Sequence, residues 1–203
     1  MKFMKWRILT VTSLVCLLPI VLGVCLWYSL PETMAIHFDL YGQPDNFASK
    51  GFVVFGLPVL MMLLQIVCCV IHDRKAQKYG EYRKFAVTIK WLIPILCFVL
   101  QTATLGYSLG WQFEIRIVAA LVVSGMFLVI GNYSLRFGAI CRTDTALSKA
   151  KKINRFIGWE TICMGILFLI SIFLPPVATA IGAWLLIPYA LLSVIYGIIV
   201  GRK

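Results

Sequence analysis

The segment 31–51 contains the residues best suited to ligand binding. His37, Asp39 and Asp45 lie close together in the sequence, and an imidazole with two carboxylates could offer three ligands to a metal ion. A zinc site normally gathers more His or Cys than this, so we expect no metal and no cofactor. Two other roles for His37 stay open. It either hydrogen-bonds loop carbonyls or Asp45 to hold the segment together, or it contacts a peptide ligand directly.

The same segment is expected to form a compact hairpin-like or Ω-type loop, because Gly42 and Pro44 are turn formers. Phe38 is one of several aromatic residues in it that could rest at the level of lipid head groups or pack on helix ends. Lys50 closes the segment, and its ammonium group could pair with Asp45 or Asp39 or extend to the head groups. We favour the pairing.

A second set of polar residues lies in the other half of the chain. Asn132 ends a long apolar stretch, where a buried amide would need to hydrogen-bond across helices. Arg142 could contact a protein partner or a lipid phosphate. Glu160 precedes another apolar stretch, where the dipole of a helix start would favour its charge. A role for Glu160 in proton coupling is the alternative.

Between these stretches the sequence predicts a basic amphipathic helix. Apolar residues recur at helical spacing and basic residues fill the positions between them: Leu147, Ala150, Ile153 and Ile157, with Lys149, Lys151, Lys152 and Arg155. Such a helix is expected to lie on an anionic membrane surface. It either anchors the loop or docks a partner.

The amino-acid composition indicates the environment of the elements that must position these residues. Of 203 residues, 61% are hydrophobic and 13% are charged, and the mean hydropathy is +0.93. A soluble domain carries about 25% charged residues. A soluble fold of this length could not bury so much apolar surface, so the lipid bilayer is the expected solvent.

Six transmembrane helices are predicted, because a span needs about 20 mostly apolar residues. Four apolar stretches cover residues 8–30, 52–71, 91–109 and 117–135. The charge-free run 161–200 is too long for one helix, and Pro175 and Pro176 divide it in two, since consecutive prolines remove two N–H donors. The predicted fold is therefore an all-α polytopic membrane protein.

Basic residues predict the orientation of these helices. Nearly all of the 19 Lys and Arg residues lie in the two ends of the chain or in the loops 72–90 and 136–160, and only Lys50 and Arg116 lie on the other side. By the positive-inside rule, both termini are expected to be cytoplasmic. This asymmetry explains the net charge of +11 without nucleic-acid binding.

Sequence motifs for catalysis are absent from the chain. It contains no HExxH, GxSxG or phosphate-binding loop motif, so we expect no catalytic residues and no enzyme activity. We also expect no Asp, Glu, Lys or Arg deep within a span. Ion-coupled transporters usually carry such groups.

Two groups of residues resemble a known family. The first is similar to the DUF1648 segment of the SdpI-like immunity proteins of Gram-positive bacteria, and it comprises Leu30-Pro31, Ile36-His37-Phe38, Gly42, Pro44-Asp45, Phe47 and Ser49-Lys50. The second resembles the later half of the same family through Gly131-Asn132-Tyr133, Arg142-Thr143 and Leu147-Ser148. Within that half, Asp144, Thr145 and Ala146 replace the family's Pro, Trp and Thr.

The resemblance implies a division into a DUF1648-like segment, 1–90, and an SdpI-like four-span segment, 91–203. It implies an immunity protein of the bacterial plasma membrane that protects against a secreted toxic peptide. The outer loop would recognise the toxin through His37, Phe38, Asp39, Asp45 and Lys50. Inside, a cytoplasmic transcriptional repressor or the inner leaflet would meet Asn132, Tyr133, Arg142, Thr143, Lys149, Lys151, Lys152 and Arg155.

Two other classes of function stay open. The chain could be a transporter of small molecules or lipids that uses proline-kinked helices, or a scaffold or sensor subunit of a membrane complex. Transport in liposomes distinguishes the first class, and co-purification in mild detergent distinguishes the second.

Overall fold

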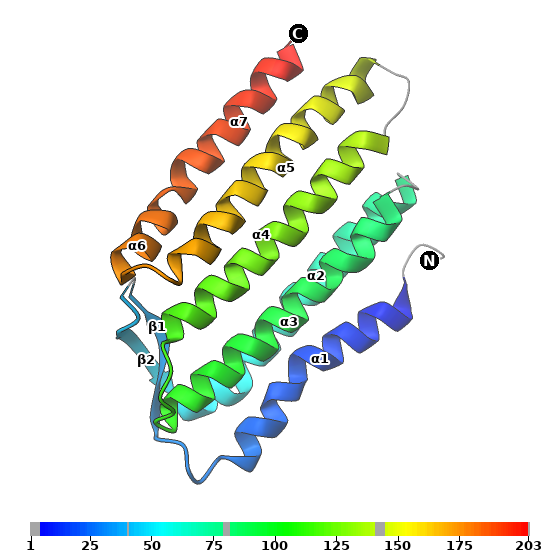
Figure 1. Ribbon diagram of the computed structural model, residues 1–203. Helices are drawn as coiled ribbons and strands as arrows, with labels where there is room; N and C mark the ends of the chain where they lie inside the picture. The colour runs from blue at the N-terminus through cyan, green and yellow to red at the C-terminus, as the bar shows by residue number, and fades with distance from the viewer. Residues whose placement is uncertain (1–4, 40, 79–81, 141–144, 203) are drawn as a thin grey trace. The chain divides into compact units, whose positions relative to one another are not determined.

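The computed structural model describes residues 5–39, 41–78, 82–140 and 145–202. In this part of the chain, six helical segments are long and apolar enough to cross a membrane: Trp6–Cys25, Phe52–Gln77, Phe85–Ser108, Ile115–Arg136, Lys151–Ser171 and Pro176–Val200. The prediction of an all-α protein with six spans is confirmed. The chain is a multi-pass membrane protein (Figure 1).

The structure divides into two compact units, Met1–Val118 and Ala119–Lys203. The first contains α1 (Trp6–Cys25), β1 (Thr33–Phe38), β2 (Pro44–Ser49), α2 (Leu57–Lys78) and α3 (Tyr82–Ser108). The second contains most of α4 (Ile115–Ile140), together with α5 (Thr145–Ser171), α6 (Pro176–Trp184) and α7 (Leu186–Arg202). The division of family segments at residue 90 stays a prediction.

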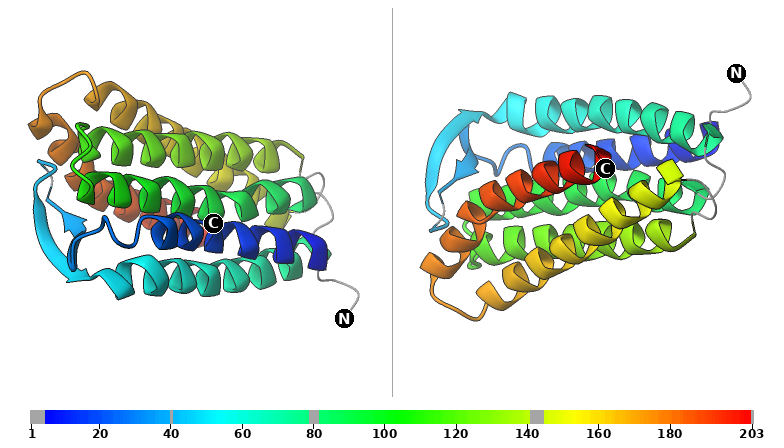
Figure 2. Two further views of the ribbon diagram at one scale, coloured as in Figure 1. Left: turned by 90° about the horizontal axis from the view of Figure 1, so that it is seen from below. Right: turned by 90° about the horizontal axis from the view of Figure 1, so that it is seen from above.

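In the first unit, α1, α2 and α3 pack against one another, side by side in both views of Figure 2. The hairpin of β1 and β2 connects the end of α1 to a π-helical turn, Phe52–Gly56, that leads into α2. Leu30, Met34 and Leu105 form a buried cluster at this end with Val53 and Val54. The cluster fixes the base of the hairpin to the helices.

The hairpin confirms the loop geometry expected from the turn formers. β1 and β2 pair antiparallel, with Thr33 opposite Ser49 and Phe38 opposite Pro44. Gly42 has a φ of +83° in the connecting turn, a backbone conformation that glycine adopts without steric cost.

In the second unit, α4 and α5 approach closely at two glycines. A Cβ on Gly131 would lie 2.8 Å from the carbonyl oxygen of Gly158, and a Cβ on Gly158 would lie 3.0 Å from that of Gly131. The Ser124 hydroxyl donates to the carbonyl of Gly165 at 2.8 Å, further along the same pair of helices. Small residues allow this approach, as is typical of membrane helices.

Proline divides the last long apolar run, as predicted. α5 ends at Ser171 and α6 begins at Pro176, the first helical position, where the missing N–H costs no hydrogen bond. A short break at Leu185 then separates α6 from α7.

Two predictions about helix ends were wrong. The segment 72–90, expected to be a loop, lies largely in α2 and α3, which place Asp73 and Lys90 inside helices. The basic segment after residue 145 is not a separate surface helix, because it forms the first turns of α5. Neither Pro nor Gly interrupts residues 145–157, so nothing ends the helix before the apolar run begins.

Candidate functional site

His37 and Asp45 form a cross-strand pair on the hairpin. The Nδ1 atom of His37 lies 2.5 Å from Oδ1 of Asp45, and the two side chains are 67% and 45% exposed. Of the alternatives left open, the structure therefore confirms hydrogen bonding between these two residues. Among the described residues, no group of three His, Cys, Asp or Glu side chains could hold a metal ion.

Asp39 has a different role from the one its spacing suggested. Its carboxylate accepts the backbone N–H groups of Tyr41 at 2.9 Å and Gln43 at 2.8 Å. This is the local pattern by which Asp stabilises a turn. Phe38, at the end of β1, packs edge-on against Tyr107 of α3 with ring centres 4.9 Å apart. Asp39 and Phe38 thus shape the hairpin and hold it on α3.

The predicted pairing of Lys50 with Asp45 or Asp39 was wrong. Its ammonium group pairs with Glu32 at 2.9 Å and donates to the carbonyls of Trp27 and Leu30, each at 3.3 Å. It also lies 4.8 Å from the centre of the Trp27 ring, close enough for a cation–π contact. Lys50 follows β2 directly and so lies at the base of the hairpin, whereas Asp39 and Asp45 lie near its tip.

Near the hairpin the positive charges are buried and the negative charges are exposed. Lys50 and Arg116 are buried, with side chains 9% and 8% exposed, while their partners Glu32 and Glu114 are 88% and 63% exposed. Arg116 pairs with Glu114 at 3.0 Å. With Asp45, these two glutamates give the exposed surface of this end of the unit an acidic character.

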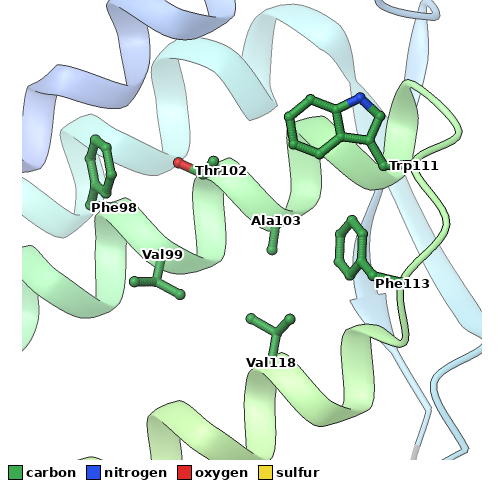
Figure 3. Close-up of a pocket in the computed structure, with 7 residues that line it drawn as sticks. All are labelled: Phe98, Val99, Thr102, Ala103, Trp111, Phe113 and Val118. Atoms are coloured by element: carbon green, nitrogen blue, oxygen red, sulfur yellow. The ribbon is translucent and has the colours of Figure 1, made fainter.

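An apolar hollow of about 350 Å³ lies at the same end of the unit, between α3 and the start of α4 (Figure 3). Trp111 and Phe113 approach it from the connection between the two helices, and the remaining walls are Phe98, Val99, Thr102, Ala103 and Val118. Sequence reasoning had singled out none of these residues, because apolar side chains in a span carry no signal of their own.

A buried polar network at the opposite end of the first unit was also missed. Lys90 on α3 pairs with Asp73 on α2 at 2.5 Å, and their side chains are 0% and 2% exposed. The amide nitrogen of Gln65 donates to the Thr12 hydroxyl and to the Lys90 carbonyl, both at 2.8 Å. The Cys69 sulfur lies 3.2 Å from the same nitrogen. The spacing of Gln65, Cys69 and Asp73, four residues apart on one helix face, was the available signal.

In the second unit, Glu160 lies within α5 and not at the start of a helix, so its expected interaction with a helix start was wrong. Its carboxylate accepts the Ser193 hydroxyl of α7 at 2.7 Å. The neighbouring Thr161 hydroxyl lies 2.9 Å from the Tyr189 hydroxyl, also on α7. Like Asp73 and Lys90, Glu160 lies inside one of the helical segments that could cross a membrane, so these three ionisable residues belong to helices and not to the loops in which they were expected.

Those residues expected on the cytoplasmic side that the structure describes lie on two helices, α4 and α5. Asn132 is exposed and not buried, because Gly131 is the residue that faces α5 and the next position of a helix points about 100° away. The guanidinium of Arg136 lies 5.9 Å from the ring centre of Tyr133. Lys151, Lys152 and Arg155 lie in α5, with the last two exposed. Arg142, Thr143 and the side chain of Lys149 lie outside the described residues.

Comparison with known proteins finds two similarities. The model of a domain of unknown function, DUF1648, matches residues 14–62, which run from α1 through the hairpin into α2. The chain is also 30% identical over 133 residues to the protein "Immunity protein SdpI" of Bacillus subtilis (strain 168). That match covers 66% of this chain and 61% of the relative. No solved structure matches the chain. The chain is therefore a multi-pass membrane protein that is similar to Immunity protein SdpI over part of its length, and its residues 14–62 match the DUF1648 model.

Proposed function

We propose that this protein is a plasma-membrane immunity protein that makes a bacterial cell resistant to a secreted toxic peptide. The observation that carries the proposal is the 30% identity to Immunity protein SdpI over 133 residues. The DUF1648 match supports it, since it spans the whole hairpin with the adjoining parts of α1 and α2. We expect this role to be non-enzymatic.

The hairpin is the part of the protein that would meet the peptide. His37 and Asp45 are exposed on adjacent strands and are free to contact a ligand. Phe38, Asp39 and Lys50 would act indirectly, because they fold the turn and fix the hairpin to α3 and to the end of α1. The exposed glutamates around them favour a partner that carries positive charge.

This assignment requires the hairpin to face outward and both termini to face the cytoplasm. The distribution of Lys and Arg supports that orientation. A cysteine introduced at the exposed Tyr41 should react with a membrane-impermeant maleimide on intact cells, and one introduced at the exposed Lys152 should react only after lysis. The unchanged chain measures the background from its native cysteines. The opposite labelling pattern would show that the hairpin faces the cytoplasm.

Resistance is tested by expressing the chain in a bacterium that is sensitive to secreted membrane-active peptides. We expect survival to rise for at least one peptide in a broad panel, and to fall again when both His37→Ala and Asp45→Ala are present. Gln43→Ala is the matched control, because that exposed turn residue contributes only its backbone to Asp39. Unchanged sensitivity across the panel would remove the immunity assignment.

We also propose that the basic start of α5 relays the presence of the peptide to a cytoplasmic repressor. Lys149, Lys151, Lys152 and Arg155 would contact that repressor or the inner leaflet, together with Arg142 and Thr143 and with Asn132 and Tyr133 on α4. Replacing Lys152 and Arg155 by Gln should release a fluorescently tagged repressor from the membrane while resistance persists. If this variant still recruits the repressor to the membrane, the basic segment is not the part of the protein that carries the relay.

Transport is a second candidate, favoured by one observation. Membrane helices that bury ionisable side chains often form substrate or ion pathways, and this chain buries the Asp73–Lys90 pair. Purified protein in liposomes should then move a small molecule or lipid, and Asp73→Asn should stop that movement. Retention of full resistance by a variant without transport would show that transport is not the basis of immunity.

A further inference from the structure

Helix α1 is held at its two ends by side chains of opposite charge. At its start, the Asp73 carboxylate accepts the backbone N–H of Lys5 at 3.2 Å. Beyond its end, the Lys50 ammonium donates to the carbonyls of Trp27 and Leu30, each at 3.3 Å. Each sign complements the helix dipole, which favours an anion at the amino end and a cation at the carboxyl end.

These two contacts connect α1 to different parts of the first unit. Asp73 belongs to the buried pair with Lys90, on α2 and α3. Lys50 belongs to the base of the hairpin, where it pairs with Glu32 directly before β1. Because α1 has 20 residues, the two ion pairs lie about 30 Å apart along it.

Between these ends, α1 is joined to α2 and α3 by further hydrogen bonds and by close packing. The Gln65 amide donates to the Thr12 hydroxyl at 2.8 Å, and the Cys97 thiol donates to the Cys16 carbonyl at 3.4 Å. A Cβ on Gly23 would lie 2.6 Å from Val54. Closely packed helices with discrete hydrogen bonds change between distinct arrangements and do not deform continuously. These contacts are the physical basis on which a displacement at one end of α1 would reach the other end.

We propose that α1 transmits the state of the hairpin to the Asp73–Lys90 pair. A ligand that draws Glu32 away from Lys50 loosens the contact of Lys50 with the end of α1, and the resulting movement of α1 weakens the contact of Asp73 with its start. The identity of that ligand as a peptide rests on the proposed function, whereas the coupling itself belongs to the protein without ligand.

Hydrogen exchange measured by mass spectrometry on the full chain in lipid nanodiscs tests the coupling. Glu32→Gln removes the charge that pairs with Lys50, and the variant should fold because the Glu32 side chain is 88% exposed. We expect amide exchange in peptides covering residues 8–16 of α1 to accelerate by about fivefold, the lower range of allosteric coupling.

Glu114→Gln is the matched control. Glu114 is also exposed and also pairs with a buried cation at the same end of the unit, but that cation, Arg116, belongs to α4. Exchange in residues 8–16 should stay at its wild-type rate in this variant. An effect of Glu32→Gln confined to residues 26–38, or an equal effect of Glu114→Gln, would overturn the proposal.

The coupling must also operate in the reverse direction, because linkage between two sites is reciprocal. Asp73→Asn should accelerate amide exchange in the hairpin peptides covering residues 33–38. If the unpaired Lys90 prevents folding, the double variant Asp73→Asn with Lys90→Gln removes both charges and tests the same link. Unchanged hairpin exchange in a folded variant would overturn the proposal. Resistance assays test the immunity function separately. The coupling along α1 can therefore be disproved without disproving the immunity function, and the reverse also holds.

Discussion

Lys90 of α3 pairs with Asp73 of α2 at 2.5 Å, with neither side chain more than 2% exposed. Asp73 also accepts the backbone N–H of Lys5, so a single carboxylate joins three helices at one end of the first unit. A buried charge is stable only when it is paired and hydrogen-bonded. This end of the unit therefore depends on both partners being present.

Removing one member of that pair should destabilise the protein strongly. Asp73→Asn leaves the Lys90 ammonium buried without a counter-charge, and we expect a loss of about 3–5 kcal/mol in the free energy of unfolding. Thermal unfolding in a fixed detergent measures the change. The double variant with Lys90→Gln should lose less than the single variant, and a larger loss in the double variant would contradict this account.

Gly131→Ala should weaken the contact between α4 and α5. The added methyl group would lie 2.8 Å from the Gly158 carbonyl oxygen, a backbone atom that can move only with its helix. We expect a loss of about 1–3 kcal/mol, typical of overpacking, in the same thermal assay. Gly125→Ala on the same helix is the control, since a Cβ there meets no atom within 4 Å. Equal losses in both variants would exclude close packing as the cause.

Gly42→Ala should strain the hairpin turn. The φ of +83° at this position costs other residues about 1–2 kcal/mol, and the change should appear as faster amide exchange in residues 33–38. Gly51→Ala provides the comparison, because Gly51 has a φ of −60° and open space around its Cβ position. Normal protection of the hairpin in Gly42→Ala would show that the turn tolerates the substitution.

The His37→Ala variant tests whether His37 contacts the ligand or only stabilises the fold. Because His37 and Asp45 are both substantially exposed, the loss of their interaction should change the unfolding free energy by less than about 1 kcal/mol. Under the proposed function, the same variant should lower resistance to the toxic peptide. Thermal unfolding and the survival assay give the two results. Reduced resistance accompanied by an equally large loss of folded protein would contradict a contact role.

The sequence by itself determined the environment and the number of the helices. The five apolar runs, the proline break that divides the last of them and the turn formers around Gly42 each act locally, so they could be recognised one at a time. The similarity to DUF1648 is also local, since the match is a continuous segment, residues 14–62. Whether a run can cross the bilayer depends on its own length and composition, so each span can be recognised without knowing which helices surround it.

Only the tertiary structure decided which polar groups meet. Lys50 pairs with Glu32 and not with Asp45, and Asp73 and Lys90 meet inside helices that were expected to be a loop. Gly131 contacts α5 while Asn132 points away. A span that is apolar on every side has no periodicity to show which face meets another helix. Helix rotation is set by the packing of small residues and by buried polar pairs, and these depend on partners far away in the sequence.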